Sequence, residues 1–175
     1  GEDGYAGYDP ASDKGLPLTV RAGTGNAIAP SFYYSWAMPG GTGGDWHRDN
    51  IAHCNQTIIC FGEAIVAEPG NMVGPTNQGV DALIEQDPSA YWDTTNKRVV
   101  SPHSPSPRLV SVPLFDPDYY ESGNTHGRHA ALRVVNWIGL FIEGRSGNNV
   151  YGRVTPITGL IDDAAGEAPR NTFPK

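Results

Sequence analysis

Two cysteines are the residues of this chain whose chemistry is easiest to compare with known spacings. Cys54 and Cys60 are separated by five residues in Cys-Asn-Gln-Thr-Ile-Ile-Cys. A structural zinc site usually needs two closer pairs of ligands, and a redox pair needs Cys-x-x-Cys, so neither template fits. Two separate buried thiols and a short-loop disulfide both remain open. We expect the disulfide, because a chain rich in Gly and Pro and poor in Lys is typical of exported proteins.

A group of acidic residues around a proline is the second candidate for chemistry. Asp116, Asp118 and Glu121 supply carboxylate oxygens at close spacing, and oxygen ligands are those that calcium prefers. Acidic residues that follow a strand are also common in ordinary turns. We expect no cofactor, with calcium at these three residues as the alternative.

The sequence carries no motif of a known catalytic site. His47-Arg48-Asp49 is similar to the catalytic loop of protein kinases, but no Gly-rich phosphate loop or Asp-Phe-Gly accompanies it. The sequence also lacks a Gly-x-Ser-x-Gly elbow, a His-Glu-x-x-His pair and a phosphate-cradling loop that ends in Gly-Lys. We therefore assign no catalytic residue and expect that the chain is not an enzyme. A hydrolase that uses His and carboxylates in an unrecognised arrangement is the less favoured alternative.

The segment at residues 68–79 has an unusual composition and precedes the only predicted helix. Its three glycines and two prolines fix backbone angles that other residues reach only with strain, which predicts a specified path for the loop. The loop either caps the core and leads the chain into the helix, or it binds a ligand. The residues concerned are Pro69, Gly70, Asn71, Met72, Gly74, Pro75 and Gly79.

The elements that must position these residues are mostly strands. Short β-branched or aromatic runs bounded by Gly, Pro and Asn predict strands, and a turn-forming stretch at 143–149 predicts a hairpin between the last two. Val110, Val112 and Leu114 share one face of a half-buried strand. The predicted strands are residues 16–20, 31–38, 57–61, 63–67, 99–100, 108–115, 131–142 and 150–157.

One short helix is predicted at about residues 77–87. Val80, Leu83 and Ile84 recur at helical spacing, and Pro88 prevents continuation. Residues 40–44 and 102–107 are predicted as loops. The fold class is thus mainly β, a β-sandwich or barrel-like domain with one short helix and long Gly/Pro-rich loops.

Composition and charge limit the partners. The chain is expected to be a single domain over residues 1–175, with polar terminal extensions at 1–15 and 162–175. Its formal charge is −7 and its bases are scattered, so nucleic acid and anionic membranes are not expected as partners. No apolar run is long enough for a membrane helix. Because the sequence starts at Gly1 without Met, we expect that an export signal or anchor has been removed.

Several motifs resemble one protein family. They look like the C-terminal extracytoplasmic part of TadE/TadG-like pilus-assembly proteins and span most of residues 17–161. The quoted runs are Pro69-Gly70-Asn71-Met72-Val73-Gly74-Pro75-Thr76-x-Gln78-Gly79, Leu83-Ile84-x-x-Asp87-Pro88-x-Ala90-x-Trp92-Asp93, Ser106-Pro107-Arg108 and Val112-Pro113-Leu114-Phe115-Asp116-Pro117. Later ones are Val134-Val135-Asn136, Phe141-x-Glu143-Gly144 and Gly152-Arg153.

The resemblance implies a non-enzymatic assembly domain of a bacterial envelope or cell-surface structure. Its partners would be other copies of itself or other pilus and envelope proteins, and its location would be extracytoplasmic, in the periplasm, at the cell surface or secreted. Family members normally have an N-terminal hydrophobic anchor, which this chain lacks. The family contributes no catalytic residue.

Two further expectations concern binding. A secreted glycan-binding module is an alternative, because Tyr33, Tyr34, Trp36 and Trp46 could stack on sugar rings if they are exposed. Residues 162–175 are polar and offer few apolar groups to offset the entropy of ordering. We expect this tail to dock on its own domain or on another copy. An exposed edge strand offers a mechanism, because an extended segment can pair with it as an additional strand.

Overall fold

The computed structural model describes residues 12–22, 32–123 and 131–156. The fold is mainly β with a curled sheet that forms a half-barrel, which confirms the predicted fold class. In chain order the elements are β1 (Pro17–Ala22), β2 (Phe32–Tyr33), α1 (Gly43–His53), β3 (Ala64–Val66), α2 (Val73–Glu85), β4 (Tyr91–Asp93), β5 (Arg98–Val100), β6 (Leu109–Phe115), α3 (Pro117–Ser122), β7 (Ala131–Ser146) and β8 (Asn149–Thr155).

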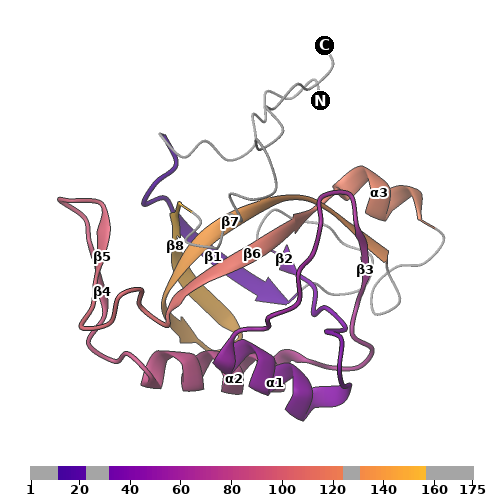
Figure 1. Ribbon diagram of the computed structural model, residues 1–175, viewed down its shortest axis with the longest axis horizontal. Coiled ribbons are helices and arrows are strands. Elements are labelled where there is room, and N and C mark those ends of the chain that lie inside the picture. The colour runs from indigo at the N-terminus through magenta and orange to yellow at the C-terminus, as the bar shows by residue number, and fades with distance from the viewer. Residues whose placement is uncertain (1–11, 23–31, 124–130, 157–175) are drawn as a thin grey trace.

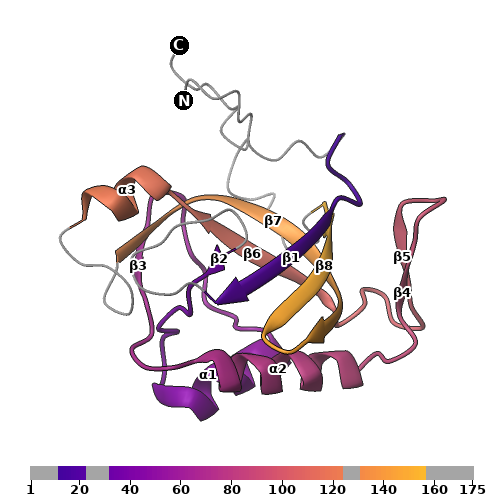
Figure 2. The same ribbon diagram turned by 180° about the vertical axis from the view of Figure 1, so that it is seen from behind.

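Strand β7 organises the main sheet (Figures 1 and 2). Within the described residues the sheet runs β2-β1-β8-β7-β3, with β6 also paired to β7. β1 and β2 are parallel, and the other pairs of this sheet are antiparallel. The predicted hairpin is confirmed, since β7 and β8 pair and Gly147 turns the chain with φ of 57°. β4 and β5 form a separate two-stranded hairpin.

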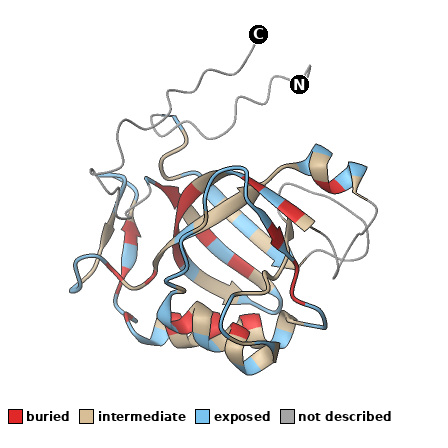
Figure 3. Cartoon of the chain, turned by 45° about the vertical axis from the view of Figure 1, so that its right-hand side comes forward, coloured by how far each residue is buried: buried red, intermediate tan, exposed pale blue. Residues whose placement is uncertain are grey.

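β7 has a continuous apolar run because other parts of the protein pack against both of its faces. Leu140 and Ile142 point into one core cluster and pack near α2, whereas Phe141 belongs to another cluster with Ala90 and Trp92. Successive strand residues face opposite sides of a sheet, so a strand buried on both faces needs consecutive apolar residues. Figure 3 shows the buried positions along these inner strands and on the sheet-facing sides of the helices.

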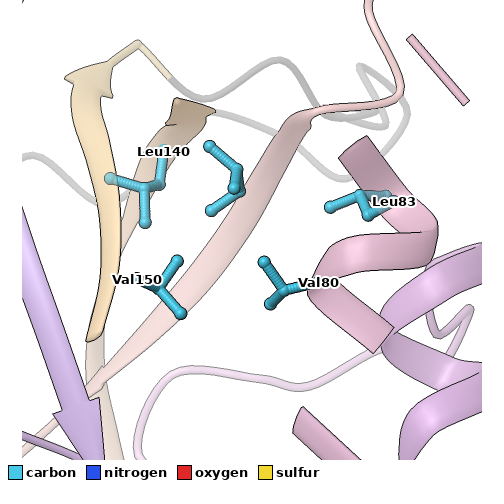
Figure 4. Close-up of a cluster of buried hydrophobic side chains, with 5 residues drawn as sticks. Val80, Leu83, Leu140 and Val150 are labelled. Atoms are coloured by element: carbon cyan, nitrogen blue, oxygen red, sulfur yellow. The ribbon is translucent and has the colours of Figure 1, made fainter. Parts of the chain in front are cut away.

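The two longer helices pack against each other beneath the sheet (Figures 1 and 2). α2 lays Val80 and Leu83 against Leu140, Ile142 and Val150 of the sheet, as Figure 4 shows for the labelled side chains. The helical spacing of these two α2 residues predicts this contact, and the structure confirms it. α2 begins earlier than predicted, because proline is tolerated in the first turn of a helix and Pro75 lies there.

Other element predictions were wrong. Among the described residues there are three helices and not one, since α1 and the short α3 were not predicted. α1 begins at Gly43, inside a segment predicted as a loop, and its sequence is too polar to show a strong apolar stripe. Residues 57–61 are not a strand, and the predicted strand at 31–38 is reduced to β2 and one bridge at Trp36. The hairpin strand β4 was also missed.

Candidate functional site

The structure divides the predicted loop at 68–79 into a turn and the start of a helix. Gly70 has a φ of 109°, in the region that favours glycine, so the specified backbone path is present there. The side chain of Asn71 accepts a hydrogen bond from the Val73 amide at 3.2 Å and closes the turn. Pro69, Gly70, Asn71 and Met72 precede α2, whereas Gly74, Pro75 and Gly79 lie within it.

This segment holds α1 against α2. The buried carboxylate of Glu68 accepts a hydrogen bond from the Gly43 amide at the start of α1, at 3.0 Å. A Cβ atom at Gly79 would lie only 2.8 Å from the carbonyl oxygen of Arg48 and 2.8 Å from Cβ of Ile51. At the other end, Gln86 donates to the Ala52 carbonyl at 2.6 Å. The contacts of the loop with the described residues are therefore those of a structural connection between the helices.

A small buried polar cluster lies between the helices and β2. His47 Nε2 and Thr76 Oγ1 are 2.9 Å apart, and both residues are buried. His47 Nδ1 has no hydrogen-bond partner among the described residues, and the Tyr33 hydroxyl faces the same Thr76 side chain. Burial lowers the pKa of His47, and the charge of Glu68 offsets part of this effect. Burial likewise raises the pKa of Tyr33.

This cluster contains an imidazole and a hydroxyl, as an acid–base site would, but both groups are buried and out of reach of a substrate. A neutral imidazole beside a hydroxyl is the arrangement that activates a nucleophile in many hydrolases. Here His47 and Thr76 are sealed beneath the helices, and a substrate has no surface from which to reach them. The cluster therefore acts as part of the interior in this structure.

A second buried polar network joins the end of α2 to β6 and β7. The Asp87 side chain is fully buried, and its Oδ2 atom accepts hydrogen bonds from the hydroxyls of Ser101 and Ser106, each at 2.6 Å. Burial alone would raise the pKa of Asp87, but these two hydroxyls and nearby positive charges hold it below its usual value. Oδ1 of Asp87 has no partner among the described residues.

Arg108 is the centre of the same network. Only 3 % of this residue is exposed, and its guanidinium lies over the Phe141 ring at 5.0 Å from the centroid. The four hydrogen bonds of the guanidinium all go to backbone carbonyls, which are strong acceptors that need partners when they are buried. The acceptors are the carbonyls of Asp87 and Ala90, each at 3.0 Å, of Ile142 at 2.8 Å and of Glu143 at 2.7 Å.

Sequence analysis missed this network. Composition presents Arg108 as one scattered base, and nothing in the spacing of residues 87–108 announces a buried arginine. The only signal that singled out Asp87, Ser106 and Arg108 was their place in the motifs that resemble the TadE/TadG-like family. Because the network ties backbone segments together and is closed to solvent, its role here is structural.

The predicted disulfide is absent from the structure. Cys54 and Cys60 are free and exposed. Cys54 ends α1 with a φ of 60°, and the amide of Cys60 is held by the Glu63 carboxylate at 2.8 Å. The two cysteines are thus held by different local contacts in this structure, and a bridge between them stays a prediction. The alternative of two buried thiols is wrong.

The calcium candidates are not arranged as ligands. Asp116 caps α3, because its side chain accepts hydrogen bonds from the amides of Asp118 and Tyr119. Asp118 and Glu121 are exposed on the helix. In the described part of the chain, no group of three or more His, Cys, Asp or Glu residues is placed to hold a metal ion.

The aromatic residues considered for sugar stacking pack inward. The centroid of the Tyr34 ring lies 5.8 Å from that of Phe115 and 5.3 Å from that of Tyr120. Trp36 packs against the same core. The indole nitrogen of Trp46 donates to the Met38 carbonyl at 2.9 Å. All four of the rings considered for stacking are thus partly buried and held by protein contacts, so they do not form an exposed row for a sugar.

What the structure does expose is an apolar surface around β3. Val66 and Val135 lie on the solvent face of the β3–β7 pair, where they are 54 % and 47 % exposed. Phe61 and Ile58, in the segment that leads into β3, are 61 % and 87 % exposed. The Gly62 amide donates to the Val134 carbonyl at 2.7 Å, so the segment that follows Phe61 runs beside β7. We call Ile58, Phe61, Val66 and Val135 the β3 surface.

The comparisons with known proteins give no guide to function. No family model, curated protein or solved structure matches this chain. Within the described residues, no helix has the length and apolar character needed to cross a bilayer. The predicted docking of residues 162–175, and most of the predicted extension at 1–15, lie outside the described residues. Function must therefore be argued from the surfaces and clusters above.

Proposed function

We propose that this chain is a non-enzymatic assembly domain that associates with further copies of itself through the β3 surface. The observation that carries the proposal is the exposure of four large apolar side chains in that one region. Contiguous exposed apolar residues commonly mark contact surfaces of proteins. Burying each such side chain fully contributes about 1.5–3 kcal/mol, so a few of them can drive association.

The character of the β3 surface suits contact between identical chains. Its four residues carry no charge, although exposed Arg133 lies on the same face of β7 as Val135. Apolar side chains of this kind can pair with their own copies across a two-fold axis. The chain as a whole carries −7 charges, so two copies repel each other at long range. Salt screens this repulsion and leaves apolar contact intact. Association should therefore increase as salt is added.

Two other arguments support the proposal. The described polar clusters around His47 and Asp87 are buried, so neither of these two clusters is open to a substrate. The motifs that resemble TadE/TadG-like pilus-assembly proteins favour an assembly role in a bacterial envelope and an extracytoplasmic location. Both the envelope role and the location are part of the proposal.

The proposal is tested by comparing the size of wild-type and variant chains in solution. Phe61→Ser and Ile58→Ser remove the most exposed apolar groups of the β3 surface without touching the buried core. Tyr91→Ser is the matched control, because Tyr91 is 58 % exposed on the β4–β5 hairpin, on the opposite side of the molecule from β3 (Figures 1 and 2). Light scattering across a concentration series gives the mass of each.

The expected result is association of the wild type and of Tyr91→Ser, with a clear loss of association in the two β3 variants. Reducing agent is kept in all samples, so that a disulfide between chains cannot produce the same masses. A wild type that remains monomeric at every concentration, or β3 variants that associate as the wild type does, would refute the proposal.

A further inference from the structure

A basic hollow lies between the β4–β5 hairpin and the main sheet. It is open, has a volume of about 350 Å³, and is lined by Lys14, Leu16, Trp92, Lys97 and Arg153 among others. A second hollow of about 170 Å³ shares Lys14, Trp92 and Lys97 with it. Figures 1 and 2 show the hairpin standing beside the ends of β1 and β8 that complete this region. We call the two hollows together the lysine pocket.

The charge of the lysine pocket is unusual for this chain. The chain has three lysines, and two of them, Lys14 and Lys97, line the pocket. Neither forms an ion pair with a described residue, whereas the neighbouring Arg153 is paired with Glu143 at 3.0 Å. Two ammonium groups at one site, neither of them paired with a described carboxylate, attract a negatively charged group.

The floor of the lysine pocket is largely apolar. The indole of Trp92 packs so closely on Gly15 that a Cβ atom there would lie 2.9 Å from the ring. Leu16 and Pro17 line the first hollow, and Val99, Leu109 and Pro156 line the second. A ligand that fits must therefore bring apolar groups and a negative charge.

We propose that the lysine pocket binds residues 157–163 of this same chain. Their sequence is Ile-Thr-Gly-Leu-Ile-Asp-Asp, so apolar side chains are followed directly by Asp162 and Asp163. Pro156, the residue before this segment, itself lines the second hollow. Seven residues reach up to about 25 Å, which is ample to return over the pocket. A segment joined this closely has a high effective concentration at the pocket, which favours its own chain over a neighbour.

The test is zero-length cross-linking of the full chain with a carbodiimide, followed by peptide mapping. This reagent joins a lysine amine to a carboxylate only when the two groups are in contact. Lys175 serves as the internal control, because it follows Asp162 and Asp163 in the sequence and reports chance collisions within the tail. A mixture of unlabelled and ¹⁵N-labelled chains separates links within one chain from links between chains.

The expected products join Lys14 or Lys97 to Asp162 or Asp163 within one chain, at severalfold higher yield than links to Lys175. Their yield should fall to the control level in about 1 M salt, which screens the ion pairs. Leu160→Ser should lower the yield severalfold, although it removes no reactive group. Unchanged yield in Leu160→Ser, yields no higher than for Lys175, or links that mostly join two chains would each overturn the proposal.

Discussion

The interior around Arg108 and the β3 surface differ in what they expose to water. The first buries polar groups and pairs them with hydrogen bonds, whereas the second leaves apolar side chains exposed. Arg108 is sealed away from solvent, and the four hydrogen bonds of its guanidinium satisfy carbonyls from two separate stretches of the chain. The β3 surface instead leaves Ile58 and Phe61 largely in water with no partner in the core. Substitutions in the first region should therefore lower stability, whereas substitutions in the second should change association and leave stability almost unchanged.

The largest effect is expected at Arg108. Arg108→Met removes four hydrogen bonds to backbone carbonyls and the positive charge near the buried Asp87 carboxylate, which should cost about 3–5 kcal/mol of unfolding free energy. Urea unfolding followed by circular dichroism measures this loss. Arg145→Met is the control, because Arg145 forms a partly exposed ion pair with Asp81, a type worth about 0–1 kcal/mol.

If Arg108→Met does not fold, Arg108→Lys provides the same comparison. Lysine keeps the charge but not the planar group that reaches several carbonyls at once, so it should fold with a smaller loss of stability. An Arg108 variant that unfolds at the same urea concentration as Arg145→Met would show that the buried network does not hold the fold together.

A smaller effect is expected where the helices touch. Gly79→Ala places a Cβ atom against backbone of α1 and should cost about 1–3 kcal/mol through overpacking. Gly74→Ala, in the same helix, meets no atom within 4 Å and should be neutral or stabilising by up to about 1 kcal/mol. Thermal unfolding of the two variants measures the difference, and equal melting temperatures would contradict the close contact between α1 and α2.

A still smaller effect, which depends on pH, is expected from His47. Because burial lowers its pKa, the unfolded chain takes up a proton first as the pH falls below about 6.5. The contribution of His47 is thus fully present above that pH and is lost on acidification. Glu68 reduces the loss, since its charge favours the protonated imidazole.

Urea midpoints between about pH 7.5 and pH 5.5 measure this contribution. His47→Leu should flatten the decline, and His53→Gln, at an exposed position of the same helix, should keep it. A steeper decline in His47→Leu than in the wild type would contradict the assigned direction.

The smallest effect is expected at the cysteines, which lie beside the β3 surface. Serine at both positions should change the unfolding free energy by less than about 0.5 kcal/mol under reducing conditions, as for other exposed positions. Both native thiols should also react rapidly with a maleimide, because they are exposed. Mass spectrometry of unreduced native material that finds the two cysteines joined would favour the original disulfide prediction over the structure.

Local pattern was enough to predict the core of the sheet. The apolar run through Leu140 and Ile142, and the turn residues after it, identify a buried strand and a hairpin from nearest neighbours alone. The helical spacing of Val80 and Leu83 likewise needs no tertiary information. These features depend on residues close together in the chain.

The missed features depend on contacts between distant residues. α1 is polar and starts with two glycines, and it is held by Glu68 and by close packing on Gly79 rather than by its own periodicity. The role of Arg108 arises only when β7 brings the carbonyls of residues 142 and 143 beside it. Short sequence windows contain no signal for either arrangement.

Hydrogen–deuterium exchange at low and high protein concentration tests the central claim, association through the β3 surface, most directly. The account predicts that amides of residues 54–67 and 131–135 become slower to exchange as concentration rises, whereas those of the β4–β5 hairpin do not change. Adding salt should extend the same protection to lower concentrations. Protection confined to the hairpin, or exchange that is independent of concentration at every position, would contradict it.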